Sequence, residues 1–260
     1  MKLTEKKRIV VKVGTSTLTH DTGKTNIARM AKLVSVLADL KNAGHQVVLV
    51  SSGAVGIGAG KLGMRERPDH TSGLQACAAV GQCELMFLYD KLFSEYGVVV
   101  SQLLFTGYTL NHPEEKAHLV DTFNQLLEYD ALPIVNENDS VSVEELLHGD
   151  NDCLSATVAQ LIGADLLILL TDTDGLFDAN PAENEDARLI GRVAEINDVY
   201  AVAGGAGSKG TGGFTTKIRA AEIATGAGIP VIIMNGERPT AIYKVLDGQP
   251  IGTYFEANSR

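Results

Sequence analysis

Apolar residues in this chain fall into two patterns, short continuous runs and longer stretches with helical spacing. The run from Arg8 to Val13 is rich in β-branched residues and predicts a strand, and several similar runs follow it. Between them, apolar residues recur every three or four positions, which predicts helices. We expect further strands at 46–50, 98–104, 132–135, 165–170 and 229–234, and helices at 27–43, 72–96, 114–129, 151–163 and 215–227, with a short helix after Pro239.

Strands that alternate with helices and are apolar on both faces indicate an α/β fold. The expected architecture is a three-layer αβα sandwich with an open, mainly parallel sheet between the helices. The stretch 204–213, with six glycines in ten residues, is the one linker-like segment, and it is equally suited to be a binding loop. We therefore predict a single domain over residues 1–260 with a two-lobed character.

The charge of the chain argues against nucleic acid as a ligand. It holds 22 Lys and Arg against 32 Asp and Glu, which gives a net charge of −10. A basic footprint is absent, and no Lys or Arg occurs between Lys116 and Arg188. This acidic stretch is typical of a solvated face, but it also fits a site whose cation is a metal.

Several other classes of protein are disfavoured. No apolar run approaches the roughly 18 residues of a membrane-spanning helix, and the first eight residues do not form a signal peptide. Three cysteines without a CxxC pair indicate a reduced, cytoplasmic setting. The six histidines show no HxxxH or HxH spacing, so we expect no structural zinc site and name no side chain as a metal ligand. A GxSxG elbow is also missing.

Three glycine-containing turns can hold an anion. They are 12–16 and 51–54, each after a predicted strand, and 210–217, which opens a predicted helix. Backbone N–H groups and a helix N-terminus favour negative charge at such places. Each turn alone could be an ordinary tight turn, but three of them with hydroxyls or a lysine attached indicate an anionic ligand.

Two familiar phosphate motifs are not supported. Residues 58–63 match GxGxxG by letter, but they begin eight residues after the strand ends, so the geometry of a dinucleotide fold is lost. Gly23-Lys24-Thr25 imitates the end of a P-loop, but Leu18 stands where its first glycine belongs.

Two polar clusters lie within sixteen residues of each other. Residues 136–139 (NEND) follow a predicted strand, and residues 149–152 (GDND) precede a predicted helix. Asn and Asp are frequent turn and cap residues, which could account for either cluster alone. Together they favour an amino-acid site, because amides bind both ammonium and carboxylate groups. Asp139 could pair with the ammonium, and Asp152 could orient lysines or a metal.

The chain resembles the amino acid kinase family over nearly its whole length. The segments that carry the resemblance are, in order, VVKVGTST, VVLVSSGAVGIG, AAVGQ, PIVNENDSV, GDNDCLSA, GADLLILLTDTDGLFDANP and GTGGFTTK. The NEND and GDND pair is the specific part, since it is similar to the members that phosphorylate glutamate. Members that act on acetylglutamate, aspartate or uridylate share the lysine-glycine start and the TD strand end but not that pair.

The resemblance implies a site, position by position. The substrate residues it implies are Ser52, Gly53, Asn136, Asp139 and Asn151. The nucleotide residues it implies are Lys12, Thr171, Asp172, Thr211, Gly212, Gly213, Phe214, Thr215, Thr216 and Lys217. Lys12 and Lys217 would contact the phosphates during transfer, and Asp152 would hold the lysines. The glutamate site would lie in a lobe of about residues 1–150 and the ATP site in a lobe of about residues 151–260.

The resemblance also implies a reaction. It is the ATP-dependent phosphorylation of the γ-carboxylate of L-glutamate to γ-glutamyl phosphate, the first step of proline biosynthesis, with Mg²⁺. A cytoplasmic homo-oligomer, dimer or tetramer, with proline as feedback inhibitor is expected, without membrane or nucleic acid as partner. Many such kinases carry a C-terminal PUA-type domain, and the chain is expected to be a short form that ends at Arg260.

Two alternatives remain at this point. One is a kinase of the same fold for another small anion, such as acetylglutamate or carbamate. The other is a catalytically silent module that senses amino acids. The NEND and GDND pair disfavours the first, and the retention of both lysines and Asp152 disfavours the second.

Overall fold

The computed structural model describes residues 5–20, 24–141, 151–179, 181, 183–196, 199 and 212–258. The chain divides into two compact units. The central unit is Val13–Asn151, and the terminal unit combines Met1–Lys12 with Asp152–Arg260.

The central unit contains three parallel strands in the order β3-β4-β2. The strands are β2 (Gln46–Ser51), β3 (Val100–Phe105) and β4 (Leu132–Glu137). The helices are α1 (Thr15–Leu18), α2 (Ile27–Asn42), α3 (Ala54–Lys61), α4 (Thr71–Ser94), α5 (Gly107–Asn111) and α6 (Pro113–Glu128). Because β2 and β4 are parallel neighbours, with Val50 opposite Val135, their carboxyl ends lie at the same edge.

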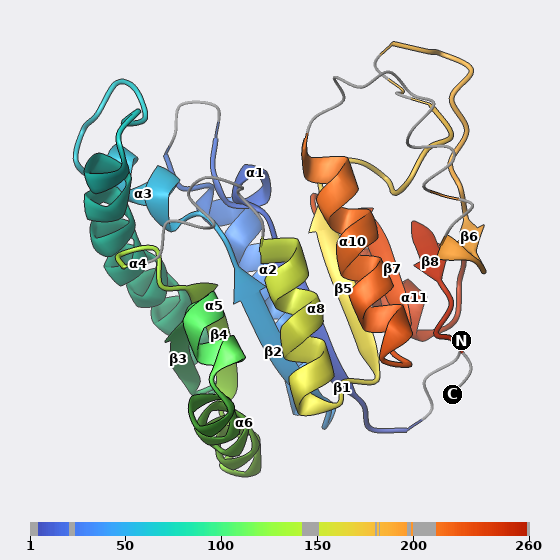
Figure 1. Ribbon diagram of the computed structural model, residues 1–260, viewed down its shortest axis with the longest axis horizontal. Helices are drawn as coiled ribbons and strands as arrows, with labels where there is room; N and C mark the ends of the chain where they lie inside the picture. Colours follow the sequence, from blue (N-terminus) through green and yellow to red (C-terminus); the bar gives the residue numbers. More distant parts are fainter. Residues whose placement is uncertain are drawn as a thin grey trace. The chain divides into compact units, whose positions relative to one another are not determined.

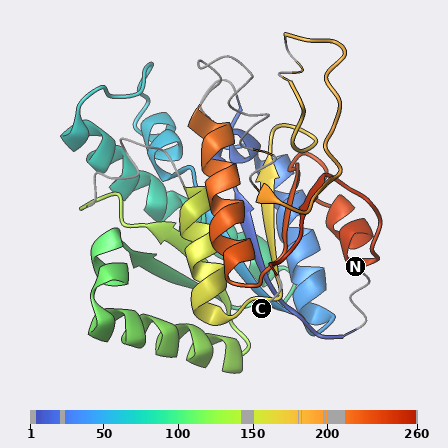
Figure 2. The same cartoon turned by 45° about the vertical axis from the view of Figure 1, so that its right-hand side comes forward.

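The terminal unit contains five strands in the order β1-β5-β7-β8-β6. They are β1 (Arg8–Val13), β5 (Leu166–Thr171), β6 (Arg192–Val193), β7 (Val231–Asn235) and β8 (Thr253–Phe255). β5 and β7 are parallel, and β8 runs antiparallel to β7. The helices are α8 (Asn151–Ile162), α10 (Gly212–Gly226) and α11 (Ala241–Leu246). Figures 1 and 2 show α8 and α10 side by side on one face of the strands, although they are far apart in the sequence.

The apolar runs form strands because they are buried on both faces. Every residue of β5 is buried, and so are the four valine and leucine residues in the middle of β2. The α2 helix begins after Asn26, whose side chain accepts a hydrogen bond from the N–H of Arg29 at 3.1 Å. Its apolar stripe is buried, as the helical spacing predicts.

Two glycines allow α3 and α4 to touch through their backbones. A Cβ atom added to Gly81 would lie 1.7 Å from the carbonyl oxygen of Ala54, and one added to Gly58 would lie 1.8 Å from that of Cys77. Only glycine permits so close an approach. The contact places the middle of α4 next to the start of α3, which directly follows β2.

The predicted fold class is confirmed: the strands are mainly parallel and helices flank them. The strands and long helices lie within a few residues of their predicted positions, and the sequence did not reveal α1, α3, α5, β6 or β8. Within the described ranges, no helix is both long enough and apolar enough to cross a bilayer.

Candidate active site

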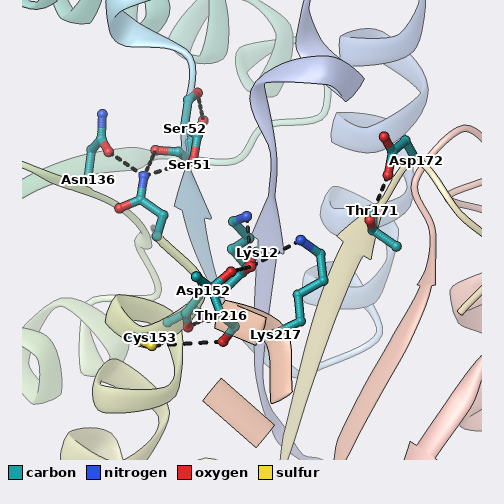
Figure 3. A network of polar contacts seen from close by, with 12 residues as sticks. Lys12, Ser51, Ser52, Asn136, Asp152, Cys153, Thr171, Asp172, Thr216 and Lys217 are labelled. Carbon is teal, nitrogen blue, oxygen red and sulfur yellow. Dashed lines mark hydrogen bonds and ion pairs between the residues drawn. The ribbon is translucent and has the colours of Figure 1, made fainter. Parts of the chain in front are cut away.

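The central unit holds a buried cluster of amides at the carboxyl ends of β2 and β4. Asn151 Nδ2 donates hydrogen bonds to Ser52 Oγ at 2.8 Å, to Asn136 Oδ1 at 2.9 Å and to the carbonyl oxygen of Ser51 at 3.3 Å. All these side chains are buried. Figure 3 shows Asn136, Ser51 and Ser52 converging around this point. The structure therefore brings together three of the five predicted substrate residues: Ser52, Asn136 and Asn151.

A fourth side chain belongs to this cluster and was not predicted. Gln82 in α4 is buried, and its Oε1 accepts a hydrogen bond from Asn136 Nδ2 at 3.0 Å. We call Gln82, Asn136, Asn151 and Ser52 the amide cluster. Gln82 lies in the AAVGQ segment, which is among the segments of the family resemblance and is thus the one sequence signal that could have indicated it.

A buried tyrosine, Tyr89, holds the end of β2 in place. Tyr89 Oη and Ser51 Oγ form a hydrogen bond of 2.9 Å, and burial raises the pKa of Tyr89, so its hydroxyl stays neutral. Gly53 follows with φ = +105°, in the left-handed region that favours glycine, and is the N-cap of α3. The structure thus places predicted residue Gly53 at the turn beside Ser52.

Asp139 lies just beyond β4 and is buried. Burial, reinforced by the charge of Glu137, raises the pKa of Asp139 to about 6, while Arg67 acts in the opposite direction. Because burial and Glu137 together outweigh Arg67, the buried carboxylate of Asp139 favours a positively charged ligand.

Three buried polar atoms in this region have no hydrogen-bond partner among the described residues. Two are acceptors, Asn151 Oδ1 and Asp139 Oδ1, and one is a donor, Gln82 Nε2. Unpaired buried polar atoms are costly, so their presence together suggests a ligand that supplies the partners. An ammonium group supplies donors for the two acceptors.

The terminal unit holds a buried carboxylate between two lysines. Asp152 Oδ1 lies 2.6 Å from Lys12 Nζ, and Asp152 Oδ2 lies 3.1 Å from Lys217 Nζ. Thr216 Oγ1 also donates to Oδ2 at 3.2 Å. Figure 3 shows both ammonium groups directed at this carboxylate. We call Lys12, Lys217 and Asp152 the lysine pair with its anchor.

Two opposing effects act on the pKa of Asp152, the anchor. Burial alone raises the pKa of Asp152, but the charges and hydrogen bonds of Lys12 and Lys217 outweigh it and hold the pKa below its ordinary value. Asp152 is therefore ionised near neutral pH. Two ammonium groups around one carboxylate leave a net positive charge, which suits a phosphate ligand.

The remaining predicted nucleotide residues lie in two places. Thr171 ends β5, and its Oγ1 donates to the carboxylate of Asp172 at 3.0 Å; Figure 3 shows this as a separate pair. Residues 212–217 form the first two turns of α10. Thr211 lies outside the described residues, as do Gly149 and Asp150 of the GDND segment.

The sequence matches the amino acid kinase family over residues 7–235. The chain belongs to this family. Solved structures of other kinases share its fold at low sequence identity. The UMP kinase from Ureaplasma parvum is 14% identical, with a TM-score of 0.66 and coverage of 97% of this chain and 99% of that one. The carbamate kinase from Giardia lamblia bound to AMP-PNP is 16% identical, with a TM-score of 0.69 and the same coverage.

Several glutamate 5-kinases are far more similar in sequence. The glutamate 5-kinase of Clostridium acetobutylicum is 54% identical over 250 residues, which are 95% of this chain and 94% of that protein. That of Clostridium perfringens is 49% identical over 98% of this chain and 97% of its own length. The glutamate 5-kinase of Moorella thermoacetica is 53% identical over 97% of this chain, but only 68% of that protein is covered. The chain thus spans nearly all of two relatives and about two thirds of the third.

Proposed function

We propose that this kinase is a glutamate 5-kinase, or γ-glutamyl kinase. It transfers the γ-phosphoryl group of ATP to the side-chain carboxylate of L-glutamate and forms ADP and L-glutamyl 5-phosphate, the first step of proline biosynthesis. Identity of about half to glutamate 5-kinases over nearly the whole chain supports this function. The observation that carries it is the buried anchor Asp152 with its two lysines, which directly follows Asn151 of the amide cluster.

The amide cluster lies in the proposed glutamate site, whose residues are Ser52, Gly53, Asn136, Asp139 and Asn151. Asp139 Oδ1 and Asn151 Oδ1 are buried acceptors without a partner in the described part of the chain, and they suit the ammonium of the substrate. The central unit is thus the glutamate lobe of our proposal.

The terminal unit is the proposed nucleotide lobe. Lys12 and Lys217 are the residues we assign to the phosphates, together with the first turns of α10 and the preceding Thr211. Backbone N–H groups at a helix start are suited to phosphate oxygens. Thr171 and Asp172, at the end of β5, occupy the carboxyl end of a parallel strand, where ligands of open α/β sheets bind.

The reaction needs positioning more than acid-base chemistry. The γ-carboxylate has an ordinary pKa of about 4.3, so near neutral pH it is already an anion and needs no general base. One of its oxygens forms a bond to the γ-phosphorus, while the bond from that phosphorus to the bridging oxygen breaks and ADP departs with the electron pair. Lys12 and Lys217 offset the negative charge of both reactants, and Asp152 keeps both lysines in place.

Magnesium enters our proposal as part of the MgATP substrate. Among the described residues, no group of three His, Cys, Asp or Glu side chains is arranged to hold a metal. Asp152 is already engaged by lysines. Nucleotide-bound Mg²⁺ commonly keeps phosphate oxygens and waters as ligands and takes only one or two carboxylates from the protein.

The remaining partners are also proposals. We place the kinase in the cytoplasm as a homo-oligomer with proline as feedback inhibitor, on the basis of the family resemblance. The net charge of −10 supports the expectation that it does not act on nucleic acid.

Hydroxylamine trapping of the acyl phosphate tests the proposed function. Glutamate should give a hydroxamate in proportion to the ADP released, and aspartate and acetylglutamate should give far less. Phosphorylation of acetylglutamate but not glutamate would indicate the kinase for another anion. Binding of glutamate without any ATP consumption would indicate a sensing module.

A further inference from the structure

The polar side chain of Gln82 occupies an unusual place for a helical residue. It follows Gly81, where α4 meets the backbone of α3, and it is buried beside the end of β4. A long polar side chain is seldom buried without a function for its polar atoms. Gln82 has no part in the proposed phosphoryl transfer.

The hydrogen bonds of the amide cluster form a chain of fixed polarity. A backbone N–H can only donate, and that of Glu137 donates to Asn136 Oδ1 at 3.0 Å, so this end of Asn136 is the oxygen. Its nitrogen must then find an acceptor, and the oxygen of Gln82 is that acceptor at 3.0 Å. Gln82 therefore accepts from the amide nitrogen of Asn136 and fixes the orientation of that amide.

The orientation of Asn136 in turn fixes the orientation of the Asn151 amide. Asn136 Oδ1 accepts from Asn151 Nδ2, and this nitrogen also donates to Ser52 Oγ. The oxygen of Asn151 is left over, buried and without a partner in the described ranges. Together with Asp139 Oδ1 it gives the site two acceptors, which can pair with two of the three N–H donors of an ammonium group.

We propose that Gln82 is a positioning residue that sets the selectivity of this site for the ammonium of the amino-acid substrate. It acts through Asn136: by accepting from that amide it keeps Asn151 turned with its oxygen toward the ligand. The inference rests on the proposed function, because it assigns a determinant of substrate choice to the same glutamate site.

Two substitutions separate this role from simple packing. Gln82→Met keeps the length of the side chain but removes the acceptor, which leaves the nitrogen of Asn136 unpaired or forces its amide to turn. Gln82→Glu keeps an oxygen that accepts from Asn136, whether its carboxyl group is ionised or protonated. Gln125→Met, at an exposed glutamine of α6, is the matched control.

The probe for the ammonium is glutarate, which has both carboxylates of glutamate but no amino group. In Gln82→Met the KM for glutamate should rise about tenfold, as expected for one lost buried hydrogen bond, while the inhibition constant of glutarate against glutamate changes less than about threefold. The KM for ATP and the kcat should stay near their wild-type values. Gln82→Glu should restore the wild-type preference for glutamate over glutarate, and Gln125→Met should change nothing.

The outcomes are distinguishable. If the wild-type protein forms no hydroxamate with glutamate, the proposed function itself is wrong. If it does, an unchanged KM in Gln82→Met overturns the inference, and so does an equal weakening of glutarate and glutamate. If Gln82→Met does not fold, the Glu variant decides alone: it must keep the wild-type preference, and loss of that preference contradicts the role of the acceptor.

Discussion

The ammonium of Lys12 lies 2.6 Å from Oδ1 of Asp152, and both side chains are buried. Burying an ion pair is costly unless its geometry and hydrogen bonds are good. Here Lys217 and Thr216 also contact the same carboxylate. Since burying these charges opposes folding, we infer that the buried ion pairs serve function. They hold two positive charges in place for an anionic ligand.

Replacement of Asp152 by Asn should therefore damage catalysis and stability together. The two lysines lose their anchor, so we expect the kcat to fall by about a hundredfold or more, with a smaller change in the KM for ATP. Breaking a buried ion pair should cost about 3–5 kcal/mol of unfolding free energy. Steady-state ADP release and denaturant unfolding measure both effects. Asp247→Asn, at an exposed position after α11, is the control and should behave as wild type. Wild-type kcat in Asp152→Asn contradicts the anchoring role.

The raised pKa of Asp139 predicts a pH dependence of glutamate binding. Its pKa is about 6, so below that pH the group is largely protonated and cannot pair with the ammonium of the substrate. The KM for glutamate should be nearly constant above about pH 7 and should rise as the pH falls through about 6. Asp139→Asn should raise the KM and remove this dependence. A wild-type KM that stays flat down to about pH 5 would show that Asp139 does not bind the ammonium.

The same pKa has a separate consequence for stability without glutamate. The folded pKa lies above the value of 3.8 expected for an unperturbed aspartate, so ionisation of Asp139 opposes folding. Its stabilising contribution is fully present below the unfolded pKa and is lost as the pH rises through about 6. Asp139→Asn should thus raise the Tm relative to wild type at about pH 8 but not at about pH 4. An equal effect of the substitution at both pH values contradicts the burial argument.

The close contact of α3 with α4 predicts a strict requirement for glycine at position 81. A methyl group in Gly81→Ala would meet the carbonyl oxygen of Ala54, so the helices must separate. We expect a loss of about 1–3 kcal/mol of unfolding free energy, with a raised KM for glutamate because Ser52 and Gln82 shift apart. The control is Gly226→Ala, where an added Cβ meets nothing within 4 Å. Equal stability and KM in both variants would show that the contact does not shape the site.

Removal of magnesium should weaken ATP binding. The chain has a net charge of −10 and no Lys or Arg between positions 116 and 188, so few side chains are available to offset the charge of the triphosphate. Calorimetric titration should show at least about tenfold weaker binding of ATP in excess EDTA than of MgATP. Equal affinity for the two forms would contradict this account of the charge.

The strands could be predicted because burial on both faces gives continuous apolar runs, and the long helices because burial of one face gives apolar residues at helical spacing. The α3 helix could not, since three of its eight residues, Gly56, Gly58 and Gly60, are glycines, which disfavour a helix. Its helical state depends on packing against α4, and this packing cannot be predicted from the local sequence. The short strands β6 and β8 likewise depend on pairing with distant residues.

The candidate site shows the same limit. Asn136 and Asn151 stand in conspicuous polar segments at element ends, so residue types and spacing indicate them. Gln82 lies inside a mostly apolar helix, where one glutamine carries no local signal. Its role depends on a contact 54 residues away in the sequence, with Asn136, and this follows only from the fold.

The central claim is that an oxygen of the glutamate γ-carboxylate attacks the γ-phosphorus of ATP. Glutamate labelled with ¹⁸O in that carboxylate tests it most directly, with hydroxylamine present to cleave the acyl phosphate at its carbon. The proposed reaction predicts that each phosphate released carries one ¹⁸O atom from glutamate, in step with hydroxamate formation. Unlabelled phosphate would mean that water, not glutamate, receives the phosphoryl group, and would contradict the account.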